Sequence, residues 1–260
     1  MDYKTISVER KAEVGILYLN RPEVLNALSD EMREELMDFM EKAAADDGLR
    51  VLILTGKGRA FSAGADLNLF KQRYEAFRQE GEGDDSGQTD LPRVFIEFPK
   101  PLIAAINGPA VGFGLTVTLN CDIRLASRKA RFSCAFVRIG VTPEFGSSYF
   151  LPRLIGYGKA AELIFTARMF DAEEAFQMGL INRLVEDENL LSEAEQMARE
   201  IAGMPSGAVQ MAKQLLRHGS HSTLEQVLDY EALVFYQRTR TREHYEAVCR
   251  TLEQIQGSKR

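Results

Sequence analysis

The sequence predicts an α/β fold in which a region of alternating strands and helices is followed by a helical C-terminal region. Two uninterrupted apolar runs, residues 51–55 and 101–106, have the length of buried strands, and each leads into a glycine-containing turn and a helical segment. From residue 159 onward, apolar residues recur mainly at helical spacing. We therefore expect a strand-and-helix core over residues 1–190 and a helical region over residues 191–260, with no linker that would separate them.

An N-terminal hairpin and a helix are expected before the first apolar run. Residues 3–20 alternate between polar and apolar side chains and then become continuously apolar, with residues 11–13 as the connection between two strands. Pro22 ends the second strand, because proline cannot donate to a central ladder. Ser29 offers an N-cap and is followed by two acidic residues, which the helix dipole favours in a first turn. The helical spacing of apolar residues extends this helix to about Ala45.

The two glycine-containing turns lead to the first functional prediction. Residues 60–67 follow the first apolar run, residues 107–114 follow the second, and each turn precedes a helical segment. A helix N-terminus leaves backbone N–H groups unpaired, and glycine lets a ligand approach the main chain closely. Two parallel strands that end in this way could direct two N–H donors at one point, where an anion or a developing oxyanion would bind. Taken alone, the first turn is equally well explained as a tight connection without chemistry.

The remaining elements follow from the same kinds of pattern. The polar residues 78–88 have little to bury and predict a loop, which is either a solvated insertion or a flap beside the first glycine turn. A short strand is expected at residues 123–126, and residues 141–148 predict a turn that leads into a helix. The later helices are expected at residues 159–166, 172–178, 190–202, 206–217, 222–238 and 242–255, with a brief strand at residues 180–185.

Composition and charge exclude several classes of function. The net charge of −6 gives no reason to expect binding to nucleic acid or to an anionic membrane surface, and no apolar run approaches the length of a membrane span. Three widely spaced cysteines predict no disulfide framework, and three late histidines have no carboxylate or cysteine cluster beside them, so no metal site is expected. The first residues show no secretory signal, and we expect a reducing, cytoplasmic environment.

Short motifs are spread along the whole chain. They are Asn20–Pro22 with Asn26–Leu28, Phe61–Leu67, Lys100–Gly112, Cys121–Ile123, Leu151–Arg153, and Ala172–Ala175 with Gly179–Leu180. Their order and spacing together resemble the crotonase (enoyl-CoA hydratase/isomerase) superfamily. The resemblance implies a superhelix of ββα units, a helical C-terminal region that assembles homotrimers or dimers of trimers, and an acyl-CoA thioester as substrate. Coenzyme A is then part of the substrate, and no separate cofactor is implied.

The resemblance also implies where the thioester oxygen binds. In the superfamily this oxygen lies between two backbone N–H groups, which by position are those of Ala63 and Phe113. Many relatives carry glycine where this chain has Phe113, a change that keeps the N–H group but could reshape the acyl pocket. The other residues expected to contact substrate are Arg21, Gly64, Ala65, Asp66, Leu67, Gly112 and Phe136.

Three charged residues have a structural explanation beside the functional one. Arg21 could meet a coenzyme A phosphate or could be a surface arginine at a strand end. Asp66 could bind ligand, but a first-turn charge or a structural salt bridge is favoured. Lys213 could reach the nucleotide end of the substrate, but a solvated helix face is favoured.

The acidic residues bear on which reaction is catalysed. Hydratases of this superfamily use two glutamates, and on our alignment those positions hold Thr116 and Phe136, neither of which can do acid–base work at neutral pH. By contrast, Thr142–Tyr149 looks like the Δ3,Δ2-enoyl-CoA isomerases, whose single catalytic glutamate would be Glu144. One carboxylate can remove a proton from C2 and return it at C4, and apolar neighbours such as Phe136 and Phe145 could raise its pKa.

Alternatives remain at this stage. Glu144 could simply be a carboxylate near a helix N-terminus, where the dipole favours a negative charge. The chain could also be an enoyl-CoA hydratase or catalyse another crotonase-type acyl-CoA reaction with water held in some other way. A third hypothesis is an acyl-CoA-binding protein without catalytic activity.

Overall fold

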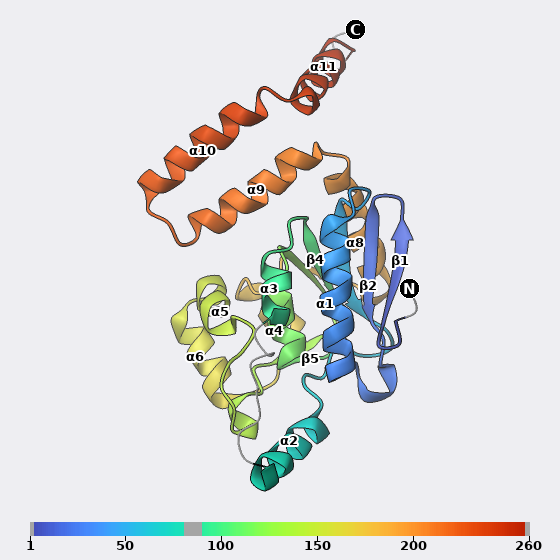
Figure 1. Cartoon of the computed structure of the whole chain (residues 1–260), viewed down its shortest axis with the longest axis vertical. Helices are drawn as coiled ribbons and strands as arrows, with labels where there is room; N and C mark the ends of the chain where they lie inside the picture. Colours follow the sequence, from blue (N-terminus) through green and yellow to red (C-terminus); the bar gives the residue numbers. More distant parts are fainter. Residues whose placement is uncertain (1–2, 81–89, 258–260) are drawn as a thin grey trace.

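The computed structural model describes residues 3–80 and 90–257. The strands within these ranges are β1 (Ile6–Lys11), β2 (Val14–Leu19), β3 (Val51–Gly56), β4 (Leu102–Ile106), β5 (Ala110–Val111), β6 (Ile123–Ser127), β7 (Arg131–Ser133), β8 (Phe170–Asp171) and β9 (Arg183–Val185). Six of them form a sheet in the order β1-β2-β3-β4-β6-β9, and the other three described strands form a small sheet in the order β5-β7-β8. Figure 1 labels β1, β2 and β4 of the large sheet and β5 of the small one. β1 and β2 are antiparallel, whereas the large sheet is parallel from β2 to β9. The predicted α/β class is confirmed.

The α-helices follow the predicted pattern closely. Those in the described ranges are α1 (Asp30–Ala45), α2 (Leu67–Glu80), α3 (Asp90–Ile96), α4 (Phe113–Leu119), α5 (Ser147–Ile155), α6 (Tyr157–Thr166), α7 (Ala172–Gln177), α8 (Leu190–Ala202), α9 (Ser206–Gly219), α10 (Leu224–Arg238) and α11 (Arg242–Gly257). The side chain of Ser29 accepts a hydrogen bond from the Met32 N–H, which confirms the predicted N-cap of α1. Among the described helices, none is long and apolar enough to cross a membrane.

One structural unit recurs along the chain. β4 of the large sheet continues into β5 of the small sheet and then into α4, and β6 continues in the same way into β7 and later α5. β3 does so in shorter form, because Ser62 makes only a single parallel bridge to Ala110 before α2 begins. A strand, a short second strand and a helix therefore repeat as the ββα arrangement, and the turn into each helix falls at the same end of the large sheet.

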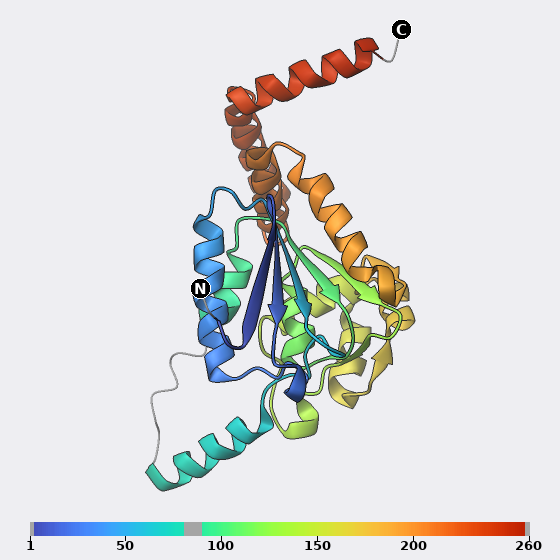
Figure 2. The same ribbon diagram turned by 90° about the vertical axis from the view of Figure 1, so that its right-hand side faces the viewer.

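The large sheet has buried residues on both faces. Because successive side chains in a strand point to opposite faces, Ile16 packs toward α8 on one side and Leu17 packs toward α1 on the other. Figure 2 shows the sheet between these two helices. All six residues of β2 and all six of β3 are buried, which explains why β3 is an uninterrupted apolar run.

The C-terminal helices α9, α10 and α11 extend away from the sheet (Figure 1). α9 is fixed to the core by Lys213, whose Nζ lies 2.7 Å from Asp122 Oδ2 and donates a 2.6 Å hydrogen bond to the carbonyl oxygen of Lys100. The side chain of Lys213 is only 7% exposed, and its burial lowers its pKa to about 8. The favoured prediction of a solvated face at Lys213 is therefore wrong: the lysine forms an internal ion pair.

Local differences from the prediction occur around the polar segment 78–88. The helix expected to end near Phe77 continues to Glu80, and residues 81–89 lie outside the described residues, as does the loop or flap expected there. α3 was not expected, although its Leu91 and Phe95 have the four-residue spacing of one buried helical face.

Candidate active site

A cavity of about 680 Å³ lies at the end of the large sheet where the two glycine turns meet. It is bounded by α1, α2, α3, both turns and the loop before α5. The predicted site residues that line it are Ala63, Gly64, Ala65, Asp66, Leu67, Gly112, Phe113, Phe136 and Glu144. Arg21 is not among its lining residues. A second cavity of about 680 Å³ lies near Tyr3 and Phe39 and contains none of the predicted residues.

The two glycine turns are in direct contact. Ser62 pairs with Ala110, and the Val111 N–H donates a 3.0 Å hydrogen bond to the carbonyl oxygen of Ser62. Gly64 adopts φ +104°, and a Cβ at this position would lie 2.9 Å from the Val111 carbonyl oxygen. Only glycine fits this approach without strain. In the register set by Ser62 and Ala110, Gly64 corresponds to Gly112. The residues that follow them, Ala65 and Phe113, therefore occupy equivalent positions on the cavity wall.

The backbone N–H groups of these turns differ in whether they are already bonded. The Ala63 N–H donates a 2.9 Å hydrogen bond to the carbonyl oxygen of Leu25, so it is not available to a ligand, and the prediction for Ala63 is corrected. On either side of Ala65, the Gly64 carbonyl and the Asp66 N–H both bond to Leu28. In an extended segment, the backbone groups of successive residues point to opposite sides. The Ala65 N–H therefore points away from Leu28.

Ala65 and Phe113 therefore provide two free donors. Within the described ranges, neither N–H has a hydrogen-bond partner. Phe113 is the first residue of α4, and the first N–H groups of a helix lack intrahelical acceptors. Both residues line the same cavity, so its wall carries two donors that a carbonyl oxygen could accept from together.

Glu144 is held at the cavity by α4. The hydroxyl of Thr116 donates a 2.6 Å hydrogen bond to Oε1 of Glu144, and Thr116 itself is fully buried. The backbone of the loop is fixed as well, because the Ser147 hydroxyl donates a 2.7 Å hydrogen bond to the Glu144 carbonyl oxygen. Buried Asn120 donates from Nδ2 to the carbonyl oxygens of Thr116 and Phe145, at 3.0 Å each. These bonds hold the loop in place even though Phe145 has a left-handed φ of +56°.

The surroundings of Glu144 favour its neutral form. The Glu144 side chain is exposed because it lines an open cavity, yet neighbouring protein atoms desolvate its carboxylate. Desolvation raises the pKa of the Glu144 carboxyl above its ordinary value, whereas the hydrogen bond from Thr116 and the positive charge of Arg33 act in the opposite direction. A carboxylate with a raised pKa is a stronger base once it is ionised.

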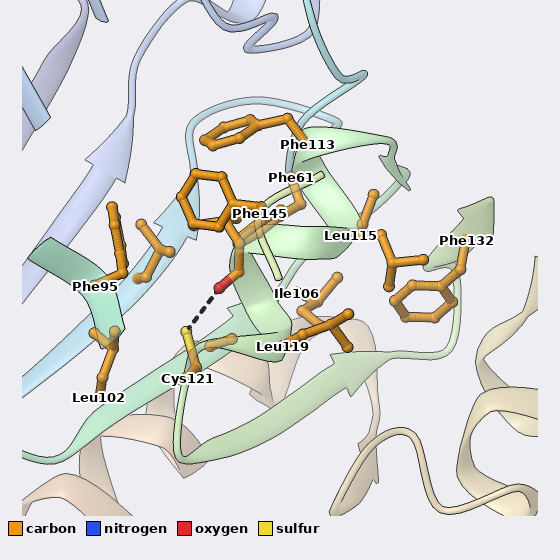
Figure 3. Packing of buried hydrophobic residues seen from close by; sticks show 14 of the residues in the cluster. Phe61, Phe95, Leu102, Ile106, Phe113, Leu115, Leu119, Cys121, Phe132 and Phe145 are labelled. Atoms are coloured by element: carbon orange, nitrogen blue, oxygen red, sulfur yellow. Dashed lines mark hydrogen bonds between the residues drawn. The ribbon is translucent and has the colours of Figure 1, made fainter. Parts of the chain in front are cut away.

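Aromatic side chains form the wall behind Glu144. The ring of Phe145 lies edge-to-face with that of Phe113, at a centroid distance of 5.5 Å, and with that of Phe95, at 5.8 Å (Figure 3). Phe136 also lines the cavity and is buried. The apolar neighbours expected around Glu144 are therefore present, and together they create space suited to a hydrocarbon chain.

Glu144 and Asp66 differ in whether a structural role explains their charge. α5 begins at Ser147 and has no side chain that caps its first turn, so the bond made by the Glu144 carboxylate goes to Thr116 and not to that helix. Arg21 lies 3.7 Å from Asp66 as an ion pair and donates a 2.7 Å hydrogen bond from Nη1 to the Ala27 carbonyl oxygen. The favoured structural salt bridge at Asp66 is present, and Arg21 is its partner.

Arg33 is one of the charged cavity residues that were not predicted from the sequence; the others are Asp30, Arg73, Arg93 and Arg138. Arg33 lines the cavity from α1, and its Nε is buried without a hydrogen-bond partner among the described residues. In the sequence it directly follows Met32, which belongs to the buried face of α1. A charge beside an apolar helical stripe is a weak signal, because most such residues turn outward into solvent.

The chain is similar in sequence and in fold to known proteins. The family described as enoyl-CoA hydratase/isomerase matches residues 9–258. A crotonyl-CoA hydratase of Syntrophomonas wolfei is 35% identical over 254 residues, which are 97% of this chain and 96% of the relative. A 1,2-epoxyphenylacetyl-CoA isomerase of Escherichia coli is 38% identical over 224 residues, 84% of each chain. The crystal structure of an enoyl-CoA hydratase from Bacillus anthracis is similar with a TM-score of 0.88 and 32% identity, covering 96% of this chain and 97% of that one.

Proposed function

Because this chain belongs to the enoyl-CoA hydratase/isomerase family of crotonase-type enzymes, we propose that it is an isomerase that shifts the double bond of a 3-enoyl-CoA to the 2-position. The observation that carries this proposal is which acidic residues of the cavity wall have an ion-pair partner. Asp30 pairs with Arg73, and Asp66 pairs with Arg21. Among the described acidic residues of the cavity wall, Glu144 is the one without an ion-pair partner within 4 Å.

The first step of the proposed reaction removes a proton from C2. Glu144 is the base, and the electron pair of the C2–H bond moves into a dienolate whose charge is largely on the thioester oxygen. The N–H groups of Ala65 and Phe113 would bind that oxygen, in place of the predicted pair Ala63 and Phe113. Removing one donor of this kind typically costs about 10²–10³ in rate. Ala65 and Phe113 thus supply the stabilisation that makes a weakly acidic C–H bond reactive.

The second step returns the proton at C4. Thr116 binds Oε1 of Glu144 and so leaves Oε2 to carry the proton from one carbon to the other. The electron pair of the dienolate then forms the new bond to hydrogen at C4, and the C2–C3 double bond is conjugated with the thioester. The step is a proton transfer without oxidation or reduction, so it requires no cofactor beyond the coenzyme A of the substrate.

Hydration is the alternative that one observation favours, because the relatives include enzymes named hydratase. Adding water requires one group to activate the water and another to deliver a proton. Thr116 and Phe136 occupy the positions at which the resemblance places the two hydratase glutamates, and Thr116 is already bonded to Glu144. Glu144 would have to serve both roles, and this is why we rank hydration second.

Product analysis separates the two reactions. The purified protein is supplied with a 3-enoyl-CoA, and the product is followed by ultraviolet absorbance and by mass. Isomerisation raises the absorbance of the conjugated thioester at unchanged mass. In a second assay the protein is supplied with 2-enoyl-CoA. A product heavier by one water, formed at a rate comparable to that of isomerisation, would replace the isomerase proposal with hydration. Binding of both thioesters without turnover would favour a binding protein.

We also propose that the helical tail assembles homotrimers or dimers of trimers. Large apolar side chains stay exposed on α10 and α11, among them Leu224, Leu228, Phe235, Leu252 and Ile255. Exposed apolar residues grouped on neighbouring helices are typical of interaction surfaces. Light scattering should give three or six chain masses for the wild type and a lower mass for Phe235→Glu. A monomeric wild type would contradict this assignment.

A further inference from the structure

Arg33 is one of the charged residues of the cavity that the proposed reaction does not use. It comes from α1, whereas Glu144 lies in the loop before α5. Both side chains nevertheless line the same cavity. Among the described residues, the two groups form no ion pair within 4 Å, although the positive charge of Arg33 lowers the pKa of the Glu144 carboxyl. The Nε of Arg33 is buried and has no acceptor in the part of the chain that the structure describes.

The other arginines of the cavity wall differ from Arg33. Arg73 forms a 2.6 Å ion pair with Asp30, and Arg138 donates a 2.6 Å hydrogen bond to the carbonyl oxygen of Ala167. Arg93 is exposed, so water can solvate it. Arg33 alone among these four combines a place on the wall with a buried donor that lacks an acceptor within the described ranges.

A buried guanidinium N–H without an acceptor is costly, and a bound ligand can remove that cost. A guanidinium presents five N–H donors in a planar fork, and a carboxylate accepts two of them side by side. The surrounding wall is largely aromatic and aliphatic, with Leu28, Phe113 and Val141 among its members. The cavity therefore suits an apolar chain that ends in an anionic group.

On the basis of the proposed function, we propose that Arg33 binds a carboxylate carried by the acyl chain, so that the preferred substrates are coenzyme A thioesters of dicarboxylic acids. The phosphates of coenzyme A are a less suitable partner, because the whole pantetheine arm separates them from the thioester. Arg33 and Glu144 line the same cavity, and Glu144 must reach C2 and C4 of the acyl chain. The Arg33 guanidinium is thus close to the acyl part of the ligand.

Binding of saturated ligands tests this inference separately from the isomerase reaction, because these ligands have no double bond to move. Calorimetry compares dicarboxylic monothioesters, from succinyl-CoA to suberyl-CoA, with the unsubstituted acyl-CoA of the same length. We expect the wild type to bind one or more of the dicarboxylic series about tenfold or more tightly, the factor that a charge-assisted hydrogen bond supplies. Arg33→Met should abolish that preference, and Arg33→Lys should keep part of it.

A matched control is Arg138→Met, which removes the same charge from the same cavity wall but from a guanidinium already bonded to Ala167. This variant should keep the preference. Equal affinities of the two series for the wild type would overturn the inference. So would an Arg33→Met variant that weakens both series equally, because Arg33 would then contact coenzyme A itself. If neither series binds, the acyl-CoA assignment of the cavity falls, and this inference falls with it.

Discussion

The hydroxyl of Thr116 donates a 2.6 Å hydrogen bond to Oε1 of Glu144 and so joins α4 to the loop before α5. α4 begins with Phe113, whose N–H is free, so one short helix fixes both a proposed oxyanion donor and the proposed base. This arrangement ties the position of the carboxylate to the position at which the thioester oxygen would bind. It also places a neutral hydroxyl where the resemblance leads us to expect a hydratase glutamate.

Loss of the Thr116 hydroxyl should alter the pH dependence of the reaction. The raised pKa of Glu144 means that activity falls as the pH decreases through that pKa, because a protonated carboxyl cannot accept the C2 proton. The hydrogen bond from Thr116 lowers this pKa, so Thr116→Val should move the acidic limb of the kcat/KM profile to higher pH. Thr116→Ser keeps the hydroxyl and should keep the profile. An unchanged acidic limb in Thr116→Val would show that this bond does not tune the base.

The backbone donor at Ala65 can be tested by an amide-to-ester replacement, which deletes its N–H and also weakens the Gly64 carbonyl as an acceptor for the Leu28 N–H. Semisynthesis that replaces the Ala65 amide by an ester removes the donor and leaves the side chain, and kcat should fall about 10²–10³-fold. The same replacement at Ala63 removes the bond to the Leu25 carbonyl, so it should reduce the free energy of unfolding by about 1 kcal/mol with little change in kcat. The reverse result, a large loss of kcat at Ala63 only, would restore the original prediction.

The ion pair between Lys213 of α9 and Asp122 should contribute to the stability of the fold and not to catalysis. Asp122 accepts from Lys213 at 2.7 Å and from the Leu102 N–H at 2.8 Å, and a quarter of its side-chain surface is exposed (25%). Asp122→Asn leaves the lysine charge buried without its counter-ion, and we expect a loss of about 2 kcal/mol in unfolding free energy, less than for a fully buried pair.

The double variant Asp122→Asn with Lys213→Met is the control for this prediction. It removes the buried charge as well, so most of the lost stability should return in denaturant titrations. If the double variant is as unstable as Asp122→Asn alone, the loss comes from the other partners of Asp122, the Leu102 N–H and Arg217, and not from the unpaired lysine.

Much of the fold could be predicted because its signals are local. β3 and β4 are buried on both faces, which gives uninterrupted apolar runs, and the glycine turns after them must contain small residues where the two main chains touch. α3 was missed because its seven residues give too short a pattern beside a polar segment. The local pattern also identified the turn that contains Ala65.

The details of the site depend on contacts between distant segments. Which amide of residues 63–65 is free depends on the pairing with Leu25 and Leu28, and no spacing within the turn reveals that pairing. The burial of Lys213 depends in the same way on Asp122, far away in the sequence. Arg33 could be recognised only after α1 had been placed against the cavity.

The most direct test of the account is the isomerisation rate of Glu144→Gln. Glutamine keeps the shape of the side chain and an oxygen for Thr116, but it cannot take a proton from C2. We expect kcat for 3-enoyl-CoA to fall about 10²–10⁴-fold, the usual contribution of a general base, while affinity for a saturated acyl-CoA stays close to that of the wild type. A Glu144→Gln enzyme that isomerises 3-enoyl-CoA at the wild-type rate would contradict the assignment of Glu144 as the base.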